Sequence, residues 1–381
     1  MKALVFDKSK SDWDTSRGFE LAEVSKPELN REDRESVIVK VEYAGVCGTD
    51  RGLWHRQVFR EQVLSTIDAE DKDYRIFGHE LYGEVAAAGA NVEKKYGIKV
   101  GDKVSADSHV VCNECFQCRN GQKNVCTNEV ILGVTRDGVF AEYVKIPAHD
   151  IWKNDVSKIR PEVAAVQDPF GNAMHAASKV DLKDKTVAIH GVGAIGQFLV
   201  LIAQAMGAKK VIGIEPSPVS QEVARKLGID ELIPLTAKEG QKPYQHDPEL
   251  TDKIKKLTGG LGVDVSFEMS GYNSALNNAI FSTRRGGDVI LFGLKNADFV
   301  IENYNKFIFN GLTLHGVIGR QIWRTWEQTK NILEDEQNGV QDKIFEIILN
   351  KGEGNVIPIG EFEPKMFEEK MKKYPKLIIK F

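Results

Sequence analysis

The sequence predicts an α/β protein that combines a β-rich first part with a doubly wound parallel sheet. Segments of strand composition dominate before about residue 160. From about residue 183, short apolar strands alternate with amphipathic helices. A glycine-rich turn joins the first of these strands to the first helix. With 381 residues, of which 42% are hydrophobic and 28% charged, the chain is expected to form two globular domains.

The first part is expected to be β-rich because strand-forming residues cluster in it. Residues 36–43 and 81–86 have strand composition, with β-branched and aromatic residues prominent. Turn signals, such as the pairs Gly101-Asp102 and Asp137-Gly138, separate the strand-forming segments.

The second part is expected to form a parallel sheet with helices on both faces, because strands and helices alternate along it. The expected strands are residues 186–190, 210–214, 263–267 and 288–292. Expected helices run from the glycine-rich turn to Met206 and from about Ser217 to Leu227. Residues 240–250 are polar and rich in turn formers, which predicts a surface loop.

The charge and hydropathy of the chain argue against two classes of partner. A net charge of −4 and a pI of about 6.1 leave no excess of positive charge to bind a nucleic-acid backbone. The most apolar helical stretch, residues 198–207, contains Gln204 and is too short to cross a bilayer. Residues 1–5 lead directly into charged residues, without the apolar region of a signal peptide. We therefore expect a cytoplasmic protein that binds neither nucleic acid nor membrane.

A dinucleotide-binding fingerprint lies between the first strand and the first helix of the second part. Residues 191–196 fit G-x-G-x-x-G, in which the glycines permit a tight turn, backbone approach to a pyrophosphate and close helix packing. The next strand ends in Glu215, whose carboxylate can accept hydrogen bonds from ribose hydroxyls and would repel a 2′-phosphate. NAD is therefore favoured over NADP; the alternative for Glu215 is a solvated charge. The expected cofactor-binding residues are Gly191, Gly193, Ile195, Gly196 and Glu215.

Four of the five cysteines form a cluster that predicts a metal site. Cys112, Cys115, Cys118 and Cys126 are separated by two, two and seven residues. Clustered cysteines in a reducing cytoplasm hold metal more often than they form disulfides. Four thiolates from one short segment can form a closed tetrahedral zinc site, whose role is structural because no coordination position is open. An iron–sulfur cluster is the alternative, but ferredoxin-type runs place the fourth cysteine closer and follow it with proline, where this chain has Thr127.

Two short motifs precede the cysteine cluster. Residues 45–50 read Gly-Val-Cys-Gly-Thr-Asp and residues 78–80 read Gly-His-Glu. Each motif alone is weak, because a lone cysteine is usually a core residue and a lone histidine usually has a structural role. Together with the four-cysteine cluster and the fingerprint, in this order over nearly the whole chain, they resemble the zinc-containing medium-chain alcohol dehydrogenases.

The resemblance implies a catalytic zinc bound by Cys47 and His79, with Glu80 in or beside the coordination sphere and Asp168 at the fourth family position. A thiolate, an imidazole and a carboxylate leave room for a displaceable ligand. Zinc would acidify a bound alcohol as it acidifies bound water, and the hydride would pass to the nicotinamide of NAD. Thr49 would supply the hydroxyl that begins a proton relay. The alternative for Thr49 is an ordinary turn hydroxyl.

Within this family the chain resembles the L-threonine 3-dehydrogenases. The similar segments are residues 138–143, 168–173, 267–271 and 319–326. One difference concerns position 52, where those enzymes carry a histidine that serves the proton relay and this chain has Gly52. His55 is the candidate substitute.

The substrate expectation stays open between two classes of alcohol. The segment between Cys47 and His79 is longer than in the threonine enzymes, and its charged insertion, about residues 56–75, is expected near the substrate entrance. Residues 47–51 also resemble archaeal glucose dehydrogenases, so a polyol or sugar is the alternative to threonine. A non-catalytic nucleotide-binding relative is the alternative of another class. It is disfavoured because Cys47, His79 and the four-cysteine cluster are intact.

The resemblance also implies the domain organisation. Residues 1–165 and 316–381 are expected to form a GroES-like catalytic domain, with a Rossmann-type NAD-binding domain at residues 166–315 between them. The family further suggests a homotetramer.

Overall fold

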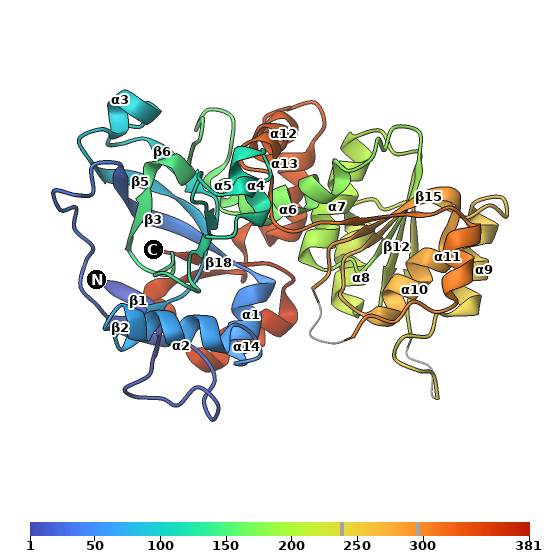
Figure 1. The fold of residues 1–381 in the computed structure, drawn as a ribbon, viewed down its shortest axis with the longest axis horizontal. Coiled ribbons are helices and arrows are strands. Elements are labelled where there is room, and N and C mark those ends of the chain that lie inside the picture. Colours follow the sequence, from blue (N-terminus) through green and yellow to red (C-terminus); the bar gives the residue numbers. More distant parts are fainter. Residues whose placement is uncertain (237–239, 295–297) are drawn as a thin grey trace. The chain divides into compact units, whose positions relative to one another are not determined.

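A computed structural model describes residues 1–236, 240–294 and 298–381 (Figure 1). The chain forms two compact units: Met1–Pro169 with Leu349–Phe381, and Phe170–Ile348. The first unit is rich in strands and the second contains a parallel sheet with helices, so the predicted fold class is confirmed. In these ranges no helix combines the length and the apolar character that a membrane span requires.

The strands of the first unit form three sheets. Its strands are β1 (Lys2–Asp7), β2 (Glu20–Glu23), β3 (Ser36–Val46), β4 (Tyr74–Ile76), β5 (Glu80–Ala88), β6 (Lys103–Ala106), β7 (His109–Val110), β8 (Val130–Ile131), β9 (Tyr143–Pro147), β10 (Ile151–Lys153), β17 (Val356–Pro358) and β18 (Leu377–Lys380). Its helices are α1 (Gly48–Trp54), α2 (Arg60–Ala69), α3 (Val92–Tyr96), α4 (Phe116–Arg119), α5 (Pro161–Ala164) and α14 (Pro364–Lys373).

The largest of these sheets has the strand order β10-β6-β5-β3-β18-β17, with β9 also paired to β3. The smaller sheets are β2-β1-β4 and β7-β8. β3 and β5 contain the two strands expected at residues 36–43 and 81–86, and they pair antiparallel. Along β3, Val37, Val39 and Val41 alternate into the hydrophobic core. The C-terminal strand β18 pairs with β3, so the last residues of the chain complete the sheet begun near its start.

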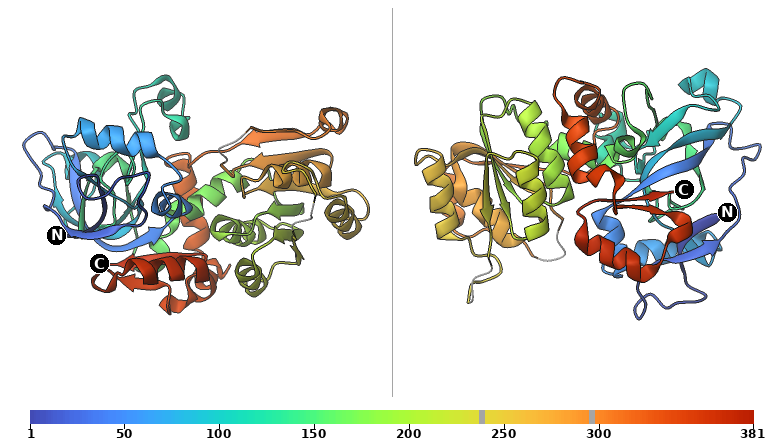
Figure 2. Two further views of the ribbon diagram at one scale, coloured as in Figure 1. Left: turned by 90° about the horizontal axis from the view of Figure 1, so that it is seen from below. Right: turned by 180° about the vertical axis from the view of Figure 1, so that it is seen from behind.

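The second unit is a doubly wound sheet. Its strands are β11 (Thr186–His190), β12 (Lys210–Glu215), β13 (Glu231–Pro234), β14 (Val263–Glu268), β15 (Thr283–Leu291) and β16 (Thr313–Gly316). Its helices are α7 (Ala194–Ala205), α8 (Pro218–Lys226), α9 (Pro248–Leu257), α10 (Asn273–Ser282), α11 (Tyr304–Phe309), α12 (Arg324–Leu333) and α13 (Val340–Lys343), and α6 (Gln167–Ala177) crosses the boundary between the units. The strands run parallel in the order β13-β12-β11-β14-β15-β16. α7 and α8 cover one face and α9 and α10 the other (Figures 1 and 2).

The elements expected in the second unit are present, with one correction. Ser217 caps α8 as the expected helix start, and a proline follows it in the first turn. The loop expected over residues 240–250 was wrong at its C-terminal end, because α9 begins at Pro248. Asp247 is the N-cap of α9, and an aspartate followed by proline is itself a signal for a helix start.

The boundaries of the two units differ from the expected ones. The first boundary follows Pro169, close to the expected residue 165, but the second follows Ile348 instead of residue 315. The intervening segment contains α12 and α13, and α13 packs against α7 of the parallel-sheet unit. The expected boundary at residue 315 came from the family resemblance. The pattern of alternating strands and helices ended at residue 292 and therefore did not reveal α12 and α13.

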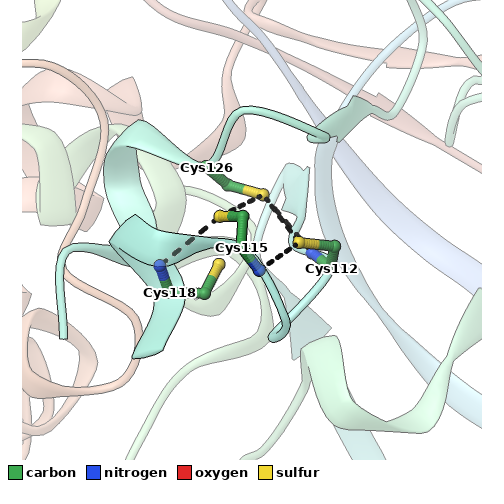
Figure 3. A group of neighbouring side chains, drawn as sticks. All are labelled: Cys112, Cys115, Cys118 and Cys126. Atoms are coloured by element: carbon green, nitrogen blue, oxygen red, sulfur yellow. Dashed lines mark hydrogen bonds between the residues drawn. The ribbon is translucent and has the colours of Figure 1, made fainter. Parts of the chain in front are cut away.

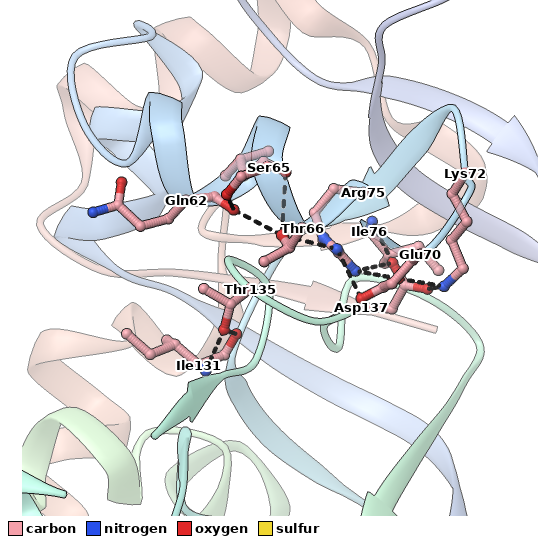
Figure 4. A network of polar contacts seen from close by, with 11 residues as sticks. Gln62, Ser65, Thr66, Glu70, Lys72, Arg75, Ile76, Ile131, Thr135 and Asp137 are labelled. Atoms are coloured by element: carbon pink, nitrogen blue, oxygen red, sulfur yellow. Dashed lines mark hydrogen bonds and ion pairs between the residues drawn. The ribbon is translucent and has the colours of Figure 1, made fainter. Parts of the chain in front are cut away.

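The charged insertion after α1 is a packed element of the first unit. α2 buries Val63 and Ile67, and β4 pairs antiparallel with β1. Arg75 of β4 has a fully buried side chain, which donates hydrogen bonds to Glu70 at 3.0 and 3.1 Å and to Asp137 at 3.0 Å (Figure 4). These bonds tie the insertion to the segment around Asp137.

We expect Arg75→Met to lower the free energy of unfolding by about 3 kcal/mol, because it removes the buried cation between the carboxylates of Glu70 and Asp137. Urea unfolding followed by circular dichroism measures the change. Arg60→Met is the matched control, since Arg60 pairs with Asp14 on the surface and its loss should leave the midpoint unchanged. Equal shifts in the two variants would show that the buried network does not stabilise the insertion.

Candidate active site

Two neighbouring antiparallel strands bring a cysteine, a histidine and a glutamate together. β3 ends at Val46, β5 begins at Glu80, and Gly45 pairs with Glu80 in the register. Cys47 and His79 therefore lie at the same end of the sheet, directly beyond the paired residues. One potential ligand atom from each of Cys47, His79 and Glu80 lies within 4.8 Å of the other two. His79 and Glu80 are buried, whereas Cys47 is partly exposed.

Asp50 contacts two of these residues, a role that its sequence motif did not predict. Its fully buried carboxylate accepts a hydrogen bond from the backbone N–H of Cys47 at 2.8 Å, at the start of α1. Its other oxygen lies 3.7 Å from Nδ1 of His79. Carboxylates that orient a ligating histidine are typical of zinc sites. The helix-capping spacing from Cys47 to Asp50 is the signal that could have identified it.

The negative charges around His79 favour positive charge at this group, either on the imidazole or on a bound metal ion. Burial would lower the pKa of His79, but the negative charges of Asp50 and Cys47 outweigh it and raise that pKa to about 10. Burial raises the pKa of the Asp50 and Glu80 carboxyls. Oδ1 of Asp50, Nδ1 of His79 and Oε1 of Glu80 are buried without a hydrogen-bond partner among the described residues. A thiolate, an imidazole and a carboxylate in this setting fit a zinc ion.

We expect Asp50→Asn to weaken metal binding at this group by about ten- to a hundredfold, because the amide keeps the shape of Asp50 but loses the charge that faces His79. Competition with a chelator measures the affinity. Asp68→Asn, on the exposed side of α2, is the control and should bind metal like the unaltered protein. Unchanged affinity in the Asp50 variant would mean that its charge does not support the site.

Asp168 and Thr49 lie near this group. The side chain of Asp168, in the first turn of α6, is 3% exposed and accepts a hydrogen bond from the N–H of Ser108 at 3.2 Å. Its charge acts on His79 and Glu80, but Asp168 is not part of the set of ligand atoms within 4.8 Å. Thr49 is partly exposed in the first turn of α1. The ligand role of Asp168 and the relay role of Thr49 stay predictions.

Neighbouring side chains account for the glycine at position 52. A Cβ added to Gly52 would lie 2.8 Å from Cγ2 of Val58, so the segment after α1 fills the space that a larger side chain would need. His55, the candidate substitute, is exposed at the C-terminal end of α1, and its charge acts on Glu368 of α14. This position favours a surface role for His55 over a relay role next to Thr49.

The four-cysteine segment folds into a second group of potential ligands. The sulfurs of Cys112, Cys115, Cys118 and Cys126 lie within 4.8 Å of one another (Figure 3). Sγ of Cys126 is 3.5 Å from that of Cys112 and 3.9 Å from that of Cys115. Four sulfurs bound tetrahedrally to zinc at about 2.3 Å would be about 3.8 Å apart. The spacing therefore fits a single zinc ion with no open position.

Backbone N–H groups point at these sulfurs. Cys115 donates to Sγ of Cys112 at 3.3 Å, and Cys118 donates to Sγ of Cys115 at 3.5 Å. Donation from Cys118 and Thr127 lowers the pKa of Cys115 to about 5, whereas burial raises that of Cys118 to about 12. The cysteines are free thiols. Backbone donation that stabilises the Cys112 and Cys115 thiolates fits metal binding.

The fingerprint forms the turn between β11 and α7. Gly191 has a φ of 101°, and a Cβ on Gly196 would clash with the carbonyl oxygen of Gly191, so the turn itself requires both glycines. A Cβ on Gly193, the N-cap of α7, would meet no described atom within 4 Å. That position is therefore open to a pyrophosphate at the helix N-terminus. Ile195 is partly exposed in the first turn of α7.

Two acidic residues hold the backbone at the ends of the two strands that flank β11. Glu215 of β12 accepts hydrogen bonds from the N–H groups of Val192 at 2.7 Å and Ser217 at 2.8 Å. A carboxylate oxygen accepts more than one bond, so ribose hydroxyls can still bind Glu215. Glu268 of β14 accepts the N–H of Ser270 at 2.7 Å and had no role in the sequence analysis. Its place at the end of the strand beside β11 could have identified it.

Comparison with known proteins covers most of the chain. Residues 33–156 match the alcohol dehydrogenase GroES-like domain, and residues 194–335 match the zinc-binding dehydrogenases. The L-threonine 3-dehydrogenase of Pyrococcus horikoshii is 39% identical over 83% of this chain and 84% of its own length. That of Caldanaerobacter subterraneus subsp. tengcongensis is 34% identical over 91% of each chain.

Solved structures share the fold over the full length. Alcohol dehydrogenase TADH from Thermus sp. ATN1 has a TM-score of 0.80 and 24% identity, with 100% of this chain and 99% of that chain covered. 2R,3R-butanediol dehydrogenase from Bacillus subtilis has a TM-score of 0.78 and 23% identity, with the same coverage. At these identities the likeness shows the fold alone.

Proposed function

Since the chain belongs to the zinc-containing medium-chain alcohol dehydrogenases and is similar to the L-threonine 3-dehydrogenases, we propose that it oxidises the secondary alcohol of L-threonine. It is a zinc-dependent, NAD-linked enzyme. The observation that supports threonine as the substrate is the 34% to 39% identity to threonine enzymes over at least 83% of the chain. The grouped Cys47, His79 and Glu80 supply the metal-binding chemistry that this reaction needs.

The residues of the first unit have distinct proposed roles. Cys47, His79 and Glu80 would hold the catalytic zinc, with Asp168 as the candidate fourth ligand. Bound zinc favours deprotonation of an alcohol by stabilising negative charge on its oxygen. Thr49, two residues after Cys47 in the first turn of α1, would take up that proton and pass it toward solvent. The four-cysteine cluster would hold a second, structural zinc.

The residues of the second unit would bind NAD. Gly191, Gly193, Ile195 and Gly196 surround the open helix N-terminus that suits a pyrophosphate. The carboxylate of Glu215 would accept hydrogen bonds from the ribose hydroxyls and repel a 2′-phosphate, which favours NAD over NADP. Bound NAD would supply the nicotinamide ring as the hydride acceptor.

A polyol or sugar is the second candidate substrate. The observation that favours it is the packing of Val58 against Gly52, where the threonine enzymes carry a relay histidine. The insertion that supplies Val58 also continues into α2, so this side of the first unit contains a longer segment than the threonine enzymes have.

The test is NADH formation, followed by absorbance, with the zinc-loaded protein and a panel of L-threonine, polyols, sugars and simple secondary alcohols. We expect threonine to be preferred in kcat/KM by about a hundredfold or more, equivalent to roughly 2.7 kcal/mol of transition-state discrimination. Turnover of a polyol or sugar with threonine inert would reject the threonine proposal and support the second candidate.

We also propose a homotetramer in the cytoplasm. α11, just before the edge strand β16, exposes Tyr304, Ile308 and Phe309, and exposed apolar side chains of this kind favour contact with another subunit. The free cysteines suit a reducing compartment. Light scattering coupled to gel filtration tests the assembly, and a monomer would reject it.

A further inference from the structure

We propose that Lys376, near the C-terminus, is a positioning residue for the catalytic metal and acts by orienting the carboxylate of Glu80. Nζ of Lys376 pairs with Oε2 of Glu80 and donates to the carbonyl oxygen of Val46 at 3.0 Å. The two charged side chains are 1% and 0% exposed. This inference rests on the proposed catalytic metal site, and Lys376 lies outside every sequence motif described above.

The large sheet brings Lys376 to Glu80 across the strand between them. β3 lies between β5 and β18, and Gly45 of β3 pairs with Glu80 on one side and with Ile378 on the other. A Cβ on Gly45 would clash with Oε2 of Glu80. Because Gly45 has no side chain, the carboxylate of Glu80 can lie over β3 and reach Lys376.

A second contact anchors the turn that precedes Lys376. The guanidinium of Arg51 donates to the carbonyl oxygens of Tyr374 at 2.8 Å and Pro375 at 3.0 Å. Arg51 lies on α1, the helix that begins beside Cys47. The helix that starts at one ligand residue therefore also holds the backbone that presents Lys376.

This pairing decides which oxygen of Glu80 is available to a metal. Oε2 is engaged by Lys376, whereas Oε1 is buried and has no hydrogen-bond partner among the described residues. A buried carboxylate oxygen left unpaired costs free energy unless it meets a donor or a positive charge. A buried ion pair alone adds little stability over apolar side chains of the same volume. The pair is therefore better explained by orientation, with one oxygen on Lys376 and the other free for the ion that Cys47 and His79 bind.

The test is metal retention in Lys376→Met. Cobalt(II) replaces zinc as the probe, because its visible absorption reports its coordination, and transfer to a chelator measures retention. We expect the metal bound by Cys47 and His79 to be lost about tenfold faster, with a changed visible spectrum. The four-cysteine metal should be retained as before. Lys380→Met, an exposed lysine at the end of β18, the strand that directly follows Lys376, is the control and should change neither readout.

Two further variants show whether Lys376 acts through Glu80. Glu80→Gln is compared with the double variant E80Q/K376M. The double variant contains no unpaired buried charge, so it provides the test if K376M alone does not fold. We expect the double variant to lose metal no faster than E80Q. Additional loss in the double variant, or a folded K376M with unchanged retention and spectrum, would overturn the proposal. If Cys47→Ser also keeps its full metal content, the metal site itself is wrongly assigned.

Discussion

Cys47→Ser is expected to lower kcat/KM for alcohol oxidation by about a thousandfold or more, equivalent to roughly 4 kcal/mol of transition-state stabilisation. The change replaces the only thiolate among the three grouped ligand residues. In the proposed reaction, activation of the alcohol would depend on the ion that this group would hold, so its loss should remove most of the rate enhancement. Steady-state NADH formation measures the rate, and atomic emission measures the zinc content, which should fall from about two ions per subunit to about one.

The Cys47 variant should remain folded, which separates a chemical defect from a structural one. Cys47 is partly exposed and lies outside the four-cysteine cluster. Thermal unfolding should therefore stay close to that of the unaltered protein. A variant that retains both zinc ions and its full kcat/KM would contradict the assignment of Cys47 as a catalytic ligand.

Cys115→Ser is expected to open the four-cysteine segment while sparing the chemistry at Cys47. Within this segment only Cys118 and Cys126 are buried, so few apolar contacts can stabilise it without metal. Protease cleavage within residues 112–126 should become faster by about a hundredfold or more, corresponding to roughly 3 kcal/mol of local stability. Limited proteolysis followed by mass spectrometry locates the cleavage.

Arg119→Gln is the matched control for the Cys115 variant. Arg119 is exposed on α4 inside the same segment, so its replacement alters the charge without removing a sulfur. Zinc content and cleavage rate should match those of the unaltered protein. A Cys115 variant that resists the protease equally well would show that metal does not stabilise this segment.

Local patterns predicted the parts of the site that lie within one short segment. The cysteine spacing from Cys112 to Cys126 predicted a group whose sulfurs the structure places within 4.8 Å. The fingerprint predicted the strand–turn–helix at Gly191. In both cases a few consecutive residues contain all the groups involved, and their spacing restricts the backbone to one kind of turn. Local spacing did not predict that Cys47 and His79 lie close together, since only the family resemblance linked the two motifs.

Contacts between distant parts of the chain were decided by the tertiary structure. Lys376 reaches Glu80 because β18 pairs with β3, and no spacing pattern connects residues so far apart. The roles of Asp50 and Arg75 likewise depend on which charged side chain faces them. The sequence by itself determined the strand and helix types, the fingerprint and the cysteine cluster, because these follow from local periodicity and spacing. Only the tertiary structure decided the unit boundary at Ile348 and the partners of buried charges, because packing between remote segments sets both.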